Sequence, residues 1–163
     1  MSEPTVSRTT LSDLIEQVAG IIDSDRTVSN KELIQFCAGC GAFDLNADAH
    51  IYHEIAETAL NLLILKKYGR DLLASMNPIE ELSTVLRPLQ KRLPTQTWRS
   101  ETQIAYQQFS TPAAIAYLAG YLLNIQPGET VLEPSCGTGC LAVWAFAVGA
   151  KVIANEIDPR RRG

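Results

Sequence analysis

A glycine-rich segment and a later acidic residue have the types and spacing of a nucleotide-binding turn. Gly137 and Gly139 are followed by Ala142, which fits the pattern G-x-G-x-x-A, and Glu156 comes about twenty positions later. Glycines let backbone amides approach a ligand at the start of a helix, and a carboxylate at the tip of the next strand can accept hydrogen bonds from both ribose hydroxyls of an adenosine. The pattern predicts an adenosine-containing ligand, although a plain turn with solvated carboxylates has the same spacing.

Glu133 distinguishes between two ligands that contain adenosine, NAD and S-adenosylmethionine. This residue ends the apolar stretch just before the glycine-rich segment. A carboxylate there repels the pyrophosphate of NAD but suits the cationic ammonium of a methionine moiety, because opposite charges attract and like charges repel. We therefore expect S-adenosylmethionine, with an NAD-dependent oxidoreductase as the alternative.

The elements that must position these residues form a strand, a helix and a second strand. Residues 130–133 and 151–155 have the short apolar pattern of strands, and the alanine-rich residues 141–148 lie between them. A strand, a crossover helix and a strand in this order predict a parallel unit that opens a doubly wound sheet. The fold class is therefore α/β, with an all-helical region before the beginning of a Rossmann-like sheet.

The preceding region has the patterns of helices. Thr10 with Asp13 and Ser29 with Glu32 predict two capping boxes at helix starts. The longest helix should cover residues 48–68, with Gly69 closing it as a left-handed cap.

Two further helix starts are predicted by an asparagine or threonine followed by proline. Asn77-Pro78 should begin a helix, and Thr111-Pro112 should begin another that continues to Leu123. The buried face of the first of these helices should consist of Ile79, Leu82, Leu86 and Leu89. A polar, proline-broken stretch around Pro94 separates the two, so we divide the chain into a helical region (1–92), a connector (93–106) and the start of a cofactor-binding domain (107–163).

Three segments resemble motifs of one enzyme family. Val131-Leu-Glu-Pro-Ser-Cys-Gly-Thr-Gly139 resembles motif I of class I S-adenosylmethionine-dependent methyltransferases, in the E-P-x-x-G-T-G form of enzymes that methylate the exocyclic amine of adenine in DNA. Asn155-Glu-Ile-Asp-Pro159 resembles their motif II, and Gln107-Gln-Phe-Ser-Thr-Pro112 resembles their motif X. The stretch from Leu93 to Arg160, with the region of Gly41-Ala-Phe-Asp44 before it, is similar to mobile-element proteins that join a DNA methylase to a strawberry-notch-type helicase.

The resemblance implies a role for each matching residue toward S-adenosylmethionine. Glu133 would hold the ammonium directly or through water, Glu156 would bind the ribose, and Ile157 would pack on adenine. The residues expected to shape the methionine pocket are Phe109, Ser110, Thr111 and Pro112. The residues expected to form the pocket wall are Pro134, Cys136, Gly137, Thr138 and Gly139. For Cys136, a filler role under the loop is as well supported as any reactive role.

The catalytic D/N-P-P-Y/F motif of this family does not occur in these 163 residues. That motif binds the target amine and stacks on a flipped base, and Asn77-Pro78 lacks its second proline and its aromatic residue. We therefore expect the chain to be the N-terminal fragment of a DNA adenine methyltransferase, inactive alone, and either a cloned fragment, a truncated gene product or one piece of a split enzyme. The alternative is a non-catalytic interaction or regulatory protein that keeps a degenerate cofactor turn.

Charge and cysteine content constrain the partners. Residues 1–84 carry 13 acidic and 6 basic groups, whereas residues 85–163 carry 5 acidic and 8 basic groups, so the first part is a poor surface for DNA, which we expect as a partner of the complete enzyme. Two interpretations stay open for the basic residues of the second part: they contact phosphate, or they form only a solvated surface. These residues are Arg87, Lys91, Arg92, Arg99, Arg160, Arg161 and Arg162. Self-association or a partner chain should cover the edge of the two-stranded sheet. Neither a signal peptide nor a membrane span is apparent, which predicts a cytoplasmic protein with reduced thiols.

A zinc site is the remaining alternative for the first two cysteines. Cys37 and Cys40 precede His50 and His53, which together supply two thiols and two imidazoles. The segment between the two pairs is shorter than in zinc fingers. We favour an interpretation in which Cys37 is a small buried residue that ends a helix and both histidines lie on a helix surface.

Overall fold

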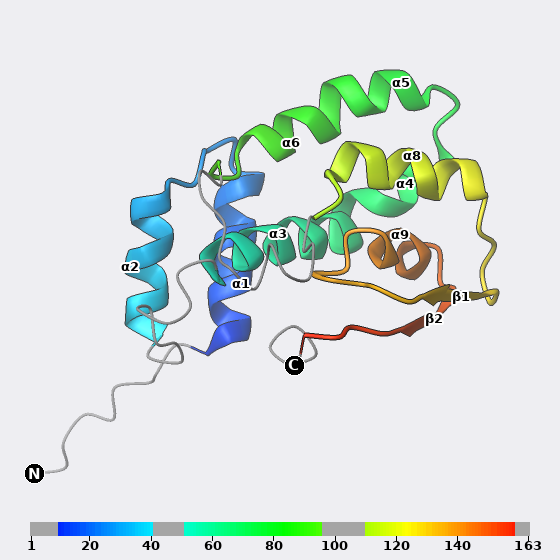
Figure 1. The fold of residues 1–163 in the computed structure, drawn as a ribbon. Coiled ribbons are helices and arrows are strands. Elements are labelled where there is room, and N and C mark those ends of the chain that lie inside the picture. Colours follow the sequence, from blue (N-terminus) through cyan, green and yellow to red (C-terminus); the bar gives the residue numbers. More distant parts are fainter. Residues whose placement is uncertain (1–9, 41–50, 96–109, 159–163) are drawn as a thin grey trace, which may run out of the picture.

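The computed structural model describes residues 10–40, 51–95 and 110–158 (Figure 1). These ranges are mostly helical, and two short strands in their last part pair in parallel. The arrangement agrees with an α/β chain in which helices precede the sheet.

The first two helices begin at the predicted capping boxes. Helix α1 (Leu11–Asp23) starts after Thr10, whose hydroxyl accepts a hydrogen bond from the Asp13 amide at 3.1 Å while the Asp13 carboxylate accepts one from the Thr10 amide at 2.9 Å. Ser29 and Glu32 make the same reciprocal pair at the start of α2 (Asn30–Cys40). Each box satisfies amides that a helix start leaves without partners. The capping-box prediction is confirmed at both positions.

The third helix continues beyond the predicted end. Helix α3 (Ile51–Leu63) passes through a π-helical segment, η1 (Ile64–Tyr68), into α4 (Gly69–Ala74). Gly69 has a helical φ of −59°, so the left-handed cap predicted there is wrong. The glycine serves close packing instead, because a Cβ at Gly69 would lie 2.8 Å from Cβ of Ala147 in a later helix.

A second long helical stretch starts at Asn77-Pro78, as predicted. It comprises α5 (Pro78–Glu81), the π-helical η2 (Leu82–Leu86) and α6 (Arg87–Lys91), and the Asn77 side chain accepts a hydrogen bond from the Glu80 amide. Leu82, Leu86 and Leu89 are buried, but Ile79 is 66% exposed. Ile79 lies in α5, the first turn of the stretch, which has no buried residue.

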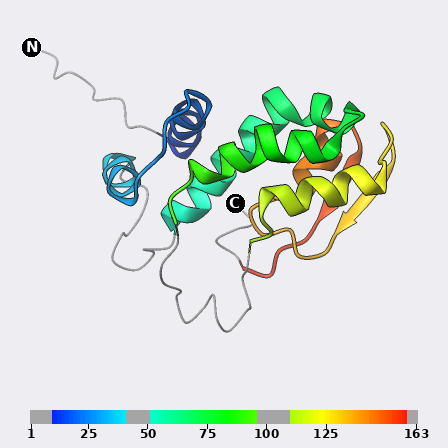
Figure 2. The same ribbon diagram turned by 90° about the horizontal axis from the view of Figure 1, so that it is seen from above.

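The remaining elements are helix α8 (Ala113–Leu123), strand β1 (Thr130–Glu133), helix α9 (Ala142–Ala147) and strand β2 (Lys151–Ala154). The strands pair in parallel with Thr130 opposite Lys151 and Glu133 opposite Ala154, so the predicted strand–helix–strand unit is confirmed. Figure 1 shows α9 between the strands and the helices α8 and α4, and Figure 2 shows the same elements from above. Gly120 of α8 approaches this helix closely, since a Cβ there would lie 2.8 Å from Cβ of Trp144.

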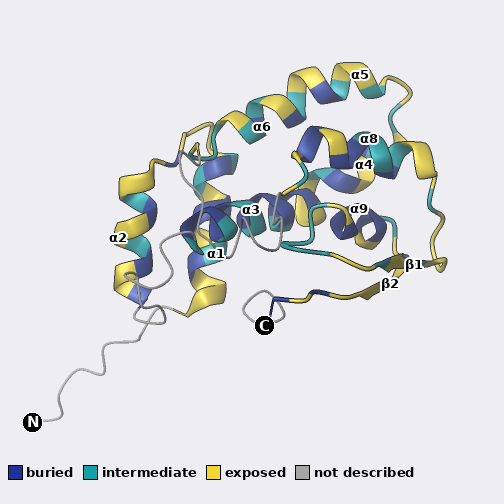
Figure 3. Cartoon of the chain, viewed as in Figure 1, coloured by how far each residue is buried: buried dark blue, intermediate teal, exposed yellow. Residues whose placement is uncertain are grey.

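One hydrophobic cluster extends from Leu14 of α1 to Trp144 of α9. It joins the helical region and the strand–helix–strand unit through the fully buried side chains of Trp144, Tyr117 and Ile64. The strands themselves are exposed along much of their length (Figure 3). Leu132 and Ile153, which are paired across the sheet, are 68% and 49% exposed. Helix α9 therefore covers one face of the sheet, and no described helix covers the other.

Candidate functional site

The glycine-rich loop follows β1 at the carboxyl end of the sheet. Gly137 and Gly139 have φ values of 53° and 89°, which favour glycine, so the loop can turn sharply before α9 begins at Ala142. The Cys136 amide donates to the Asn155 carbonyl at 2.9 Å, and the Asn155 amide donates to the Glu133 carbonyl at 2.9 Å. These backbone bonds hold the ends of the two strands together beside the loop.

Glu156 lies just after β2 with its carboxylate against this loop. The side chain is buried, and its two oxygens accept hydrogen bonds at 2.8 Å from the amides of Gly137 and Asp158. The sequence predicted a carboxylate at a strand tip, and the structure brings this one to the first glycine of the loop. Two amide donors fix its orientation, and each carboxylate oxygen keeps a second lone pair that can accept a hydrogen bond from a ligand.

The other carboxylate predicted for this site, Glu133, is half-buried at the end of β1. Its Oε1 accepts a hydrogen bond from the Ser135 amide at 3.3 Å, within its own turn. The Asn155 side chain donates to the Pro134 carbonyl at 3.0 Å, which ties the same turn to β2. Glu133 and Pro134 are thus part of the turn that precedes the glycines.

The segment matched to motif X reaches the loop through a third carboxylate. Ser110 donates from its hydroxyl to Oε2 of Glu57 at 2.6 Å, and Thr138 of the loop donates to the same oxygen at 3.2 Å. Helix α8 starts at Ala113 after Pro112, without the side-chain cap that Thr111 was predicted to provide, since Thr111 precedes the first helical residue by two positions. Phe109 lies outside the described residues.

The remaining predicted residues differ in their exposure. Ile157, expected to pack on adenine, is 67% exposed. Cys136 is half-buried, and its thiol lies 3.9 Å from the Gly137 carbonyl. Ile157 is therefore turned to solvent, whereas Cys136 is partly packed within the loop.

Glu57 and Asn61 are site residues that the sequence analysis did not identify. They lie one turn apart on α3, and Nδ2 of the buried Asn61 donates to the Thr138 carbonyl at 2.9 Å and lies 3.6 Å from Sγ of Cys140. A signal was present in the sequence, because two polar residues four positions apart interrupt an apolar helix face. The signal could not reveal their shared partner, Thr138, which lies 81 positions after Glu57.

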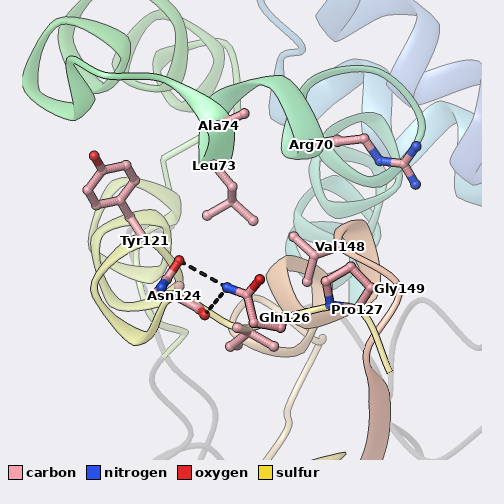
Figure 4. A pocket seen from close by; sticks show the side chains of 11 residues that line it. Arg70, Leu73, Ala74, Tyr121, Asn124, Gln126, Pro127, Val148 and Gly149 are labelled. Atoms are coloured by element: carbon pink, nitrogen blue, oxygen red, sulfur yellow. Dashed lines mark hydrogen bonds between the residues drawn. The ribbon is translucent and has the colours of Figure 1, made fainter. Parts of the chain in front are cut away.

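Several cavities lie around these elements. One of about 120 Å³ is bordered by α3, Leu93, the segment before α8 and Cys140. A larger one of about 570 Å³ lies at the amino end of the strands, between Leu73, Tyr121, Pro127 and Val148 (Figure 4). Ligands of parallel α/β sheets bind at the carboxyl ends of the strands, so of these two cavities the smaller adjoins the candidate site. Another cavity, of about 370 Å³, is also lined by Glu57.

The residues considered for zinc do not form a site within the described part of the chain. Cys37 and Cys40 are buried, and no group of three metal-ligating residues occurs among the described residues. Burial raises the pKa of the Cys37 thiol to about 11, which disfavours the thiolate that binds metal. His53 is buried, contrary to the surface position predicted, because α3 is enclosed on more than one side; His50 lies outside the described residues.

The basic residues of the second half have different environments. Arg92 donates to the Ile22 carbonyl at 2.7 Å and pairs with Asp25, so it ties the end of α6 to α1. Arg87 and Lys91 are exposed on α6, and Arg99 and residues 160–162 lie outside the described residues.

None of the described helices has the length and apolar character needed to span a membrane.

Comparison of the chain with family models, curated proteins and solved structures finds no match.

Proposed function

We propose that this chain supplies the opening of an S-adenosylmethionine-binding, Rossmann-like domain in a DNA adenine methyltransferase. One observation carries the proposal: the Glu156 carboxylate, at the tip of β2, meets the amide of Gly137 in the loop after β1. A parallel strand pair, a glycine turn and an acidic residue at the next strand tip are the parts that bind an adenosine ribose. The resemblance of motifs I, II and X supports the same cofactor.

The residues fit this cofactor in charge and hydrogen-bonding capacity. Glu156 would accept hydrogen bonds from the ribose hydroxyls, Ile157 would cover the adenine, and the glycine turn would let the loop backbone approach the ligand. When bound, the cofactor supplies an electrophilic methyl group, whose bond to sulfur breaks as a bond to the adenine amine forms and the amine loses a proton. This chain's residues would bind and orient, and they need no metal for that role.

The proposal is tested by calorimetric titration with S-adenosylhomocysteine and, separately, NAD. Glu156→Ala should weaken binding of S-adenosylhomocysteine by about tenfold to a hundredfold, because hydrogen bonds to a charged group contribute about 1.5–3 kcal/mol. Glu129→Gln is the matched control, since Glu129 also accepts a backbone hydrogen bond, from Gln126, but lies at the opposite end of the strands. Tighter binding of NAD, or equal affinity in all three proteins, would contradict the proposal.

We do not propose catalysis by these 163 residues alone. The D/N-P-P-Y/F motif would have to come from elsewhere, and DNA would be bound by the complete enzyme. Transfer of labelled methyl groups to DNA by the purified chain would show that this division of roles is wrong. We place the enzyme in the cytoplasm, where Cys37, Cys40, Cys136 and Cys140, none of which forms a disulfide in the structure, would remain reduced.

A second candidate function is a non-catalytic interaction protein whose sheet is completed by a second copy of the chain. The exposed pair Leu132 and Ile153 favours it, because parallel sheets are normally covered on both faces. The molecular mass in solution tests this candidate independently of cofactor binding.

A further inference from the structure

Helix α3 places a carboxylate at the site from outside the strand–helix–strand unit. Oε2 of Glu57 accepts hydrogen bonds from Ser110, just before α8, and from Thr138, in the glycine loop. One side chain thus joins the segment that the sequence resemblance assigns to the methionine pocket and the loop that it assigns to the pocket wall. Both of these donors are neutral hydroxyls.

Asn61, one helical turn further along α3, holds the same loop residue. Its amide nitrogen donates to the Thr138 carbonyl at 2.9 Å. The backbone and the hydroxyl of Thr138 are therefore both bound to α3. This fixes the distance between the loop and the Glu57 carboxylate.

The small cavity lies where these contacts meet. Its volume is about 120 Å³, and Glu57, Asn61, Ser110 and Cys140 are among the residues that line it. The size is suited to a small polar group, and Glu57 is the acidic residue on its wall. Glu133 does not line this cavity, and its Oε1 binds the Ser135 amide.

Glu57 and Glu156 flank the glycine loop at consecutive residues. Glu156 binds the amide of Gly137, and Glu57 binds the hydroxyl of Thr138. Consecutive Cα atoms are about 3.8 Å apart, so the two carboxylates bind neighbouring positions of this turn. One carboxylate suits a ribose diol, and the other, beside a small cavity, suits a cation.

We propose that Glu57 of α3 binds the ammonium group at the amino-acid end of the cofactor, so that the helical region completes the binding site. This inference rests on the proposed function and deepens it. It assigns to Glu57 the role that the sequence resemblance gave to Glu133. Asn61 is a positioning residue in this scheme, because it acts through Thr138.

The test compares two ligands in one set of proteins. The first ligand is S-adenosylhomocysteine, and the second is its analogue in which hydrogen replaces the α-ammonium group. Glu57→Gln keeps an oxygen acceptor for Ser110 and Thr138 but removes the charge. It should weaken S-adenosylhomocysteine binding by about tenfold and leave the analogue within twofold, because only the first ligand loses an interaction with a charged partner.

Three further variants make the result specific. Glu54→Gln, one turn earlier on α3, is the matched control and should change neither affinity. Glu156→Ala should weaken both ligands equally. Ser110→Ala, at an exposed position, removes one hydrogen bond that orients Glu57 and should produce a smaller loss for S-adenosylhomocysteine only, which keeps the test valid if Glu57→Gln does not fold.

The failures of the two proposals are distinguishable. Binding of both ligands that depends on Glu156 but is unaffected by the Glu57 and Ser110 variants would overturn the role of Glu57 alone. An equal loss of both ligands in Glu57→Gln, with native circular dichroism, would also overturn it, because Glu57 would then only support the loop. Absence of binding of either ligand to the unaltered protein would overturn the proposed function together with this inference.

Discussion

Individual carboxylates in this protein gain their roles from hydrogen-bond donors that approach them. Both oxygens of Glu156 accept from backbone amides, so Glu156→Gln would turn its amide group toward an N–H donor. The glutamine variant therefore disturbs the loop as well as the charge. The same reasoning does not apply to Glu57, because hydroxyl donors can rotate toward a remaining oxygen.

Asp23 provides a pH-dependent contribution to stability. Its carboxylate accepts from Nζ of Lys67 at 2.7 and 2.8 Å and from the Tyr68 hydroxyl at 2.8 Å. The hydrogen bond from Lys67, followed by that from Tyr68, holds the pKa of Asp23 below its usual range. The unfolded chain therefore binds a proton at higher pH than the folded one, and this stabilisation is present above the ordinary pKa of about 4 and lost as pH falls through the lowered value.

We expect Asp23→Asn to lower the free energy of unfolding at neutral pH, with a difference from the unaltered protein that shrinks below about pH 4. Urea unfolding at a series of pH values measures it. Glu16→Gln, which removes an exposed ion pair with Lys66 between the same two helical segments, should have a smaller effect. A difference that stays constant from pH 7 to pH 2 would contradict this account.

At the scale of elements, α9 packs against η1, α4 and α8. Glycines at two positions allow this, since Gly69 faces Ala147 and Gly120 faces Trp144. Tyr117 of α8 adds to the same contact, with its ring 5.2 Å from that of Trp144 and its hydroxyl donating to the Leu72 carbonyl. Burial raises the pKa of Tyr117 to about 12, so the hydroxyl remains a donor at physiological pH.

Gly120→Ala should destabilise the protein by about 1–3 kcal/mol, because the new Cβ would lie 2.8 Å from Cβ of Trp144 and force the helices apart. Gly20→Ala is the matched control in α1, where nothing lies within 4 Å of an added Cβ. The control should stabilise by about 0.5–1 kcal/mol through helix propensity. Urea unfolding compares them, and a shift in the same direction for both variants would show that the contact between α8 and α9 is not tight.

At the scale of the whole molecule, the sheet is the least covered part of the described structure. The outer face carries the paired Leu132 and Ile153, while α9 lies against the opposite face. Apolar surface left exposed on a parallel sheet favours association.

If a second copy covers this face, light scattering should give a mass that increases with protein concentration. Ile153→Lys should shift the equilibrium toward the monomer, because it places a charge in the buried contact. Leu122→Lys, on the exposed side of α8 where Leu122 is 80% exposed, is the control and should leave the mass unchanged. A constant monomeric mass over the whole concentration range would contradict the second candidate function.

The sequence by itself determined the features that depend on neighbours a few positions away. Both capping boxes, the helix start at Asn77-Pro78 and the strand at Thr130–Glu133 could be predicted, because caps and strand patterns follow from local hydrogen bonds and side-chain alternation. The placement of Glu156 next to the glycine turn also followed, since parallel strands bring their carboxyl ends to the same edge.

Only the tertiary structure decided the features that depend on distant segments. Gly69 is a packing glycine because α9 approaches it, Ile79 is exposed because the first turn of its helical stretch is not buried, and His53 is buried because α3 is central. Glu57 and Asn61 join the candidate site through Thr138, which lies 81 and 77 positions further along the chain. Packing across such separations depends on how the helices contact one another, and this cannot be predicted from the spacing of residues along the sequence.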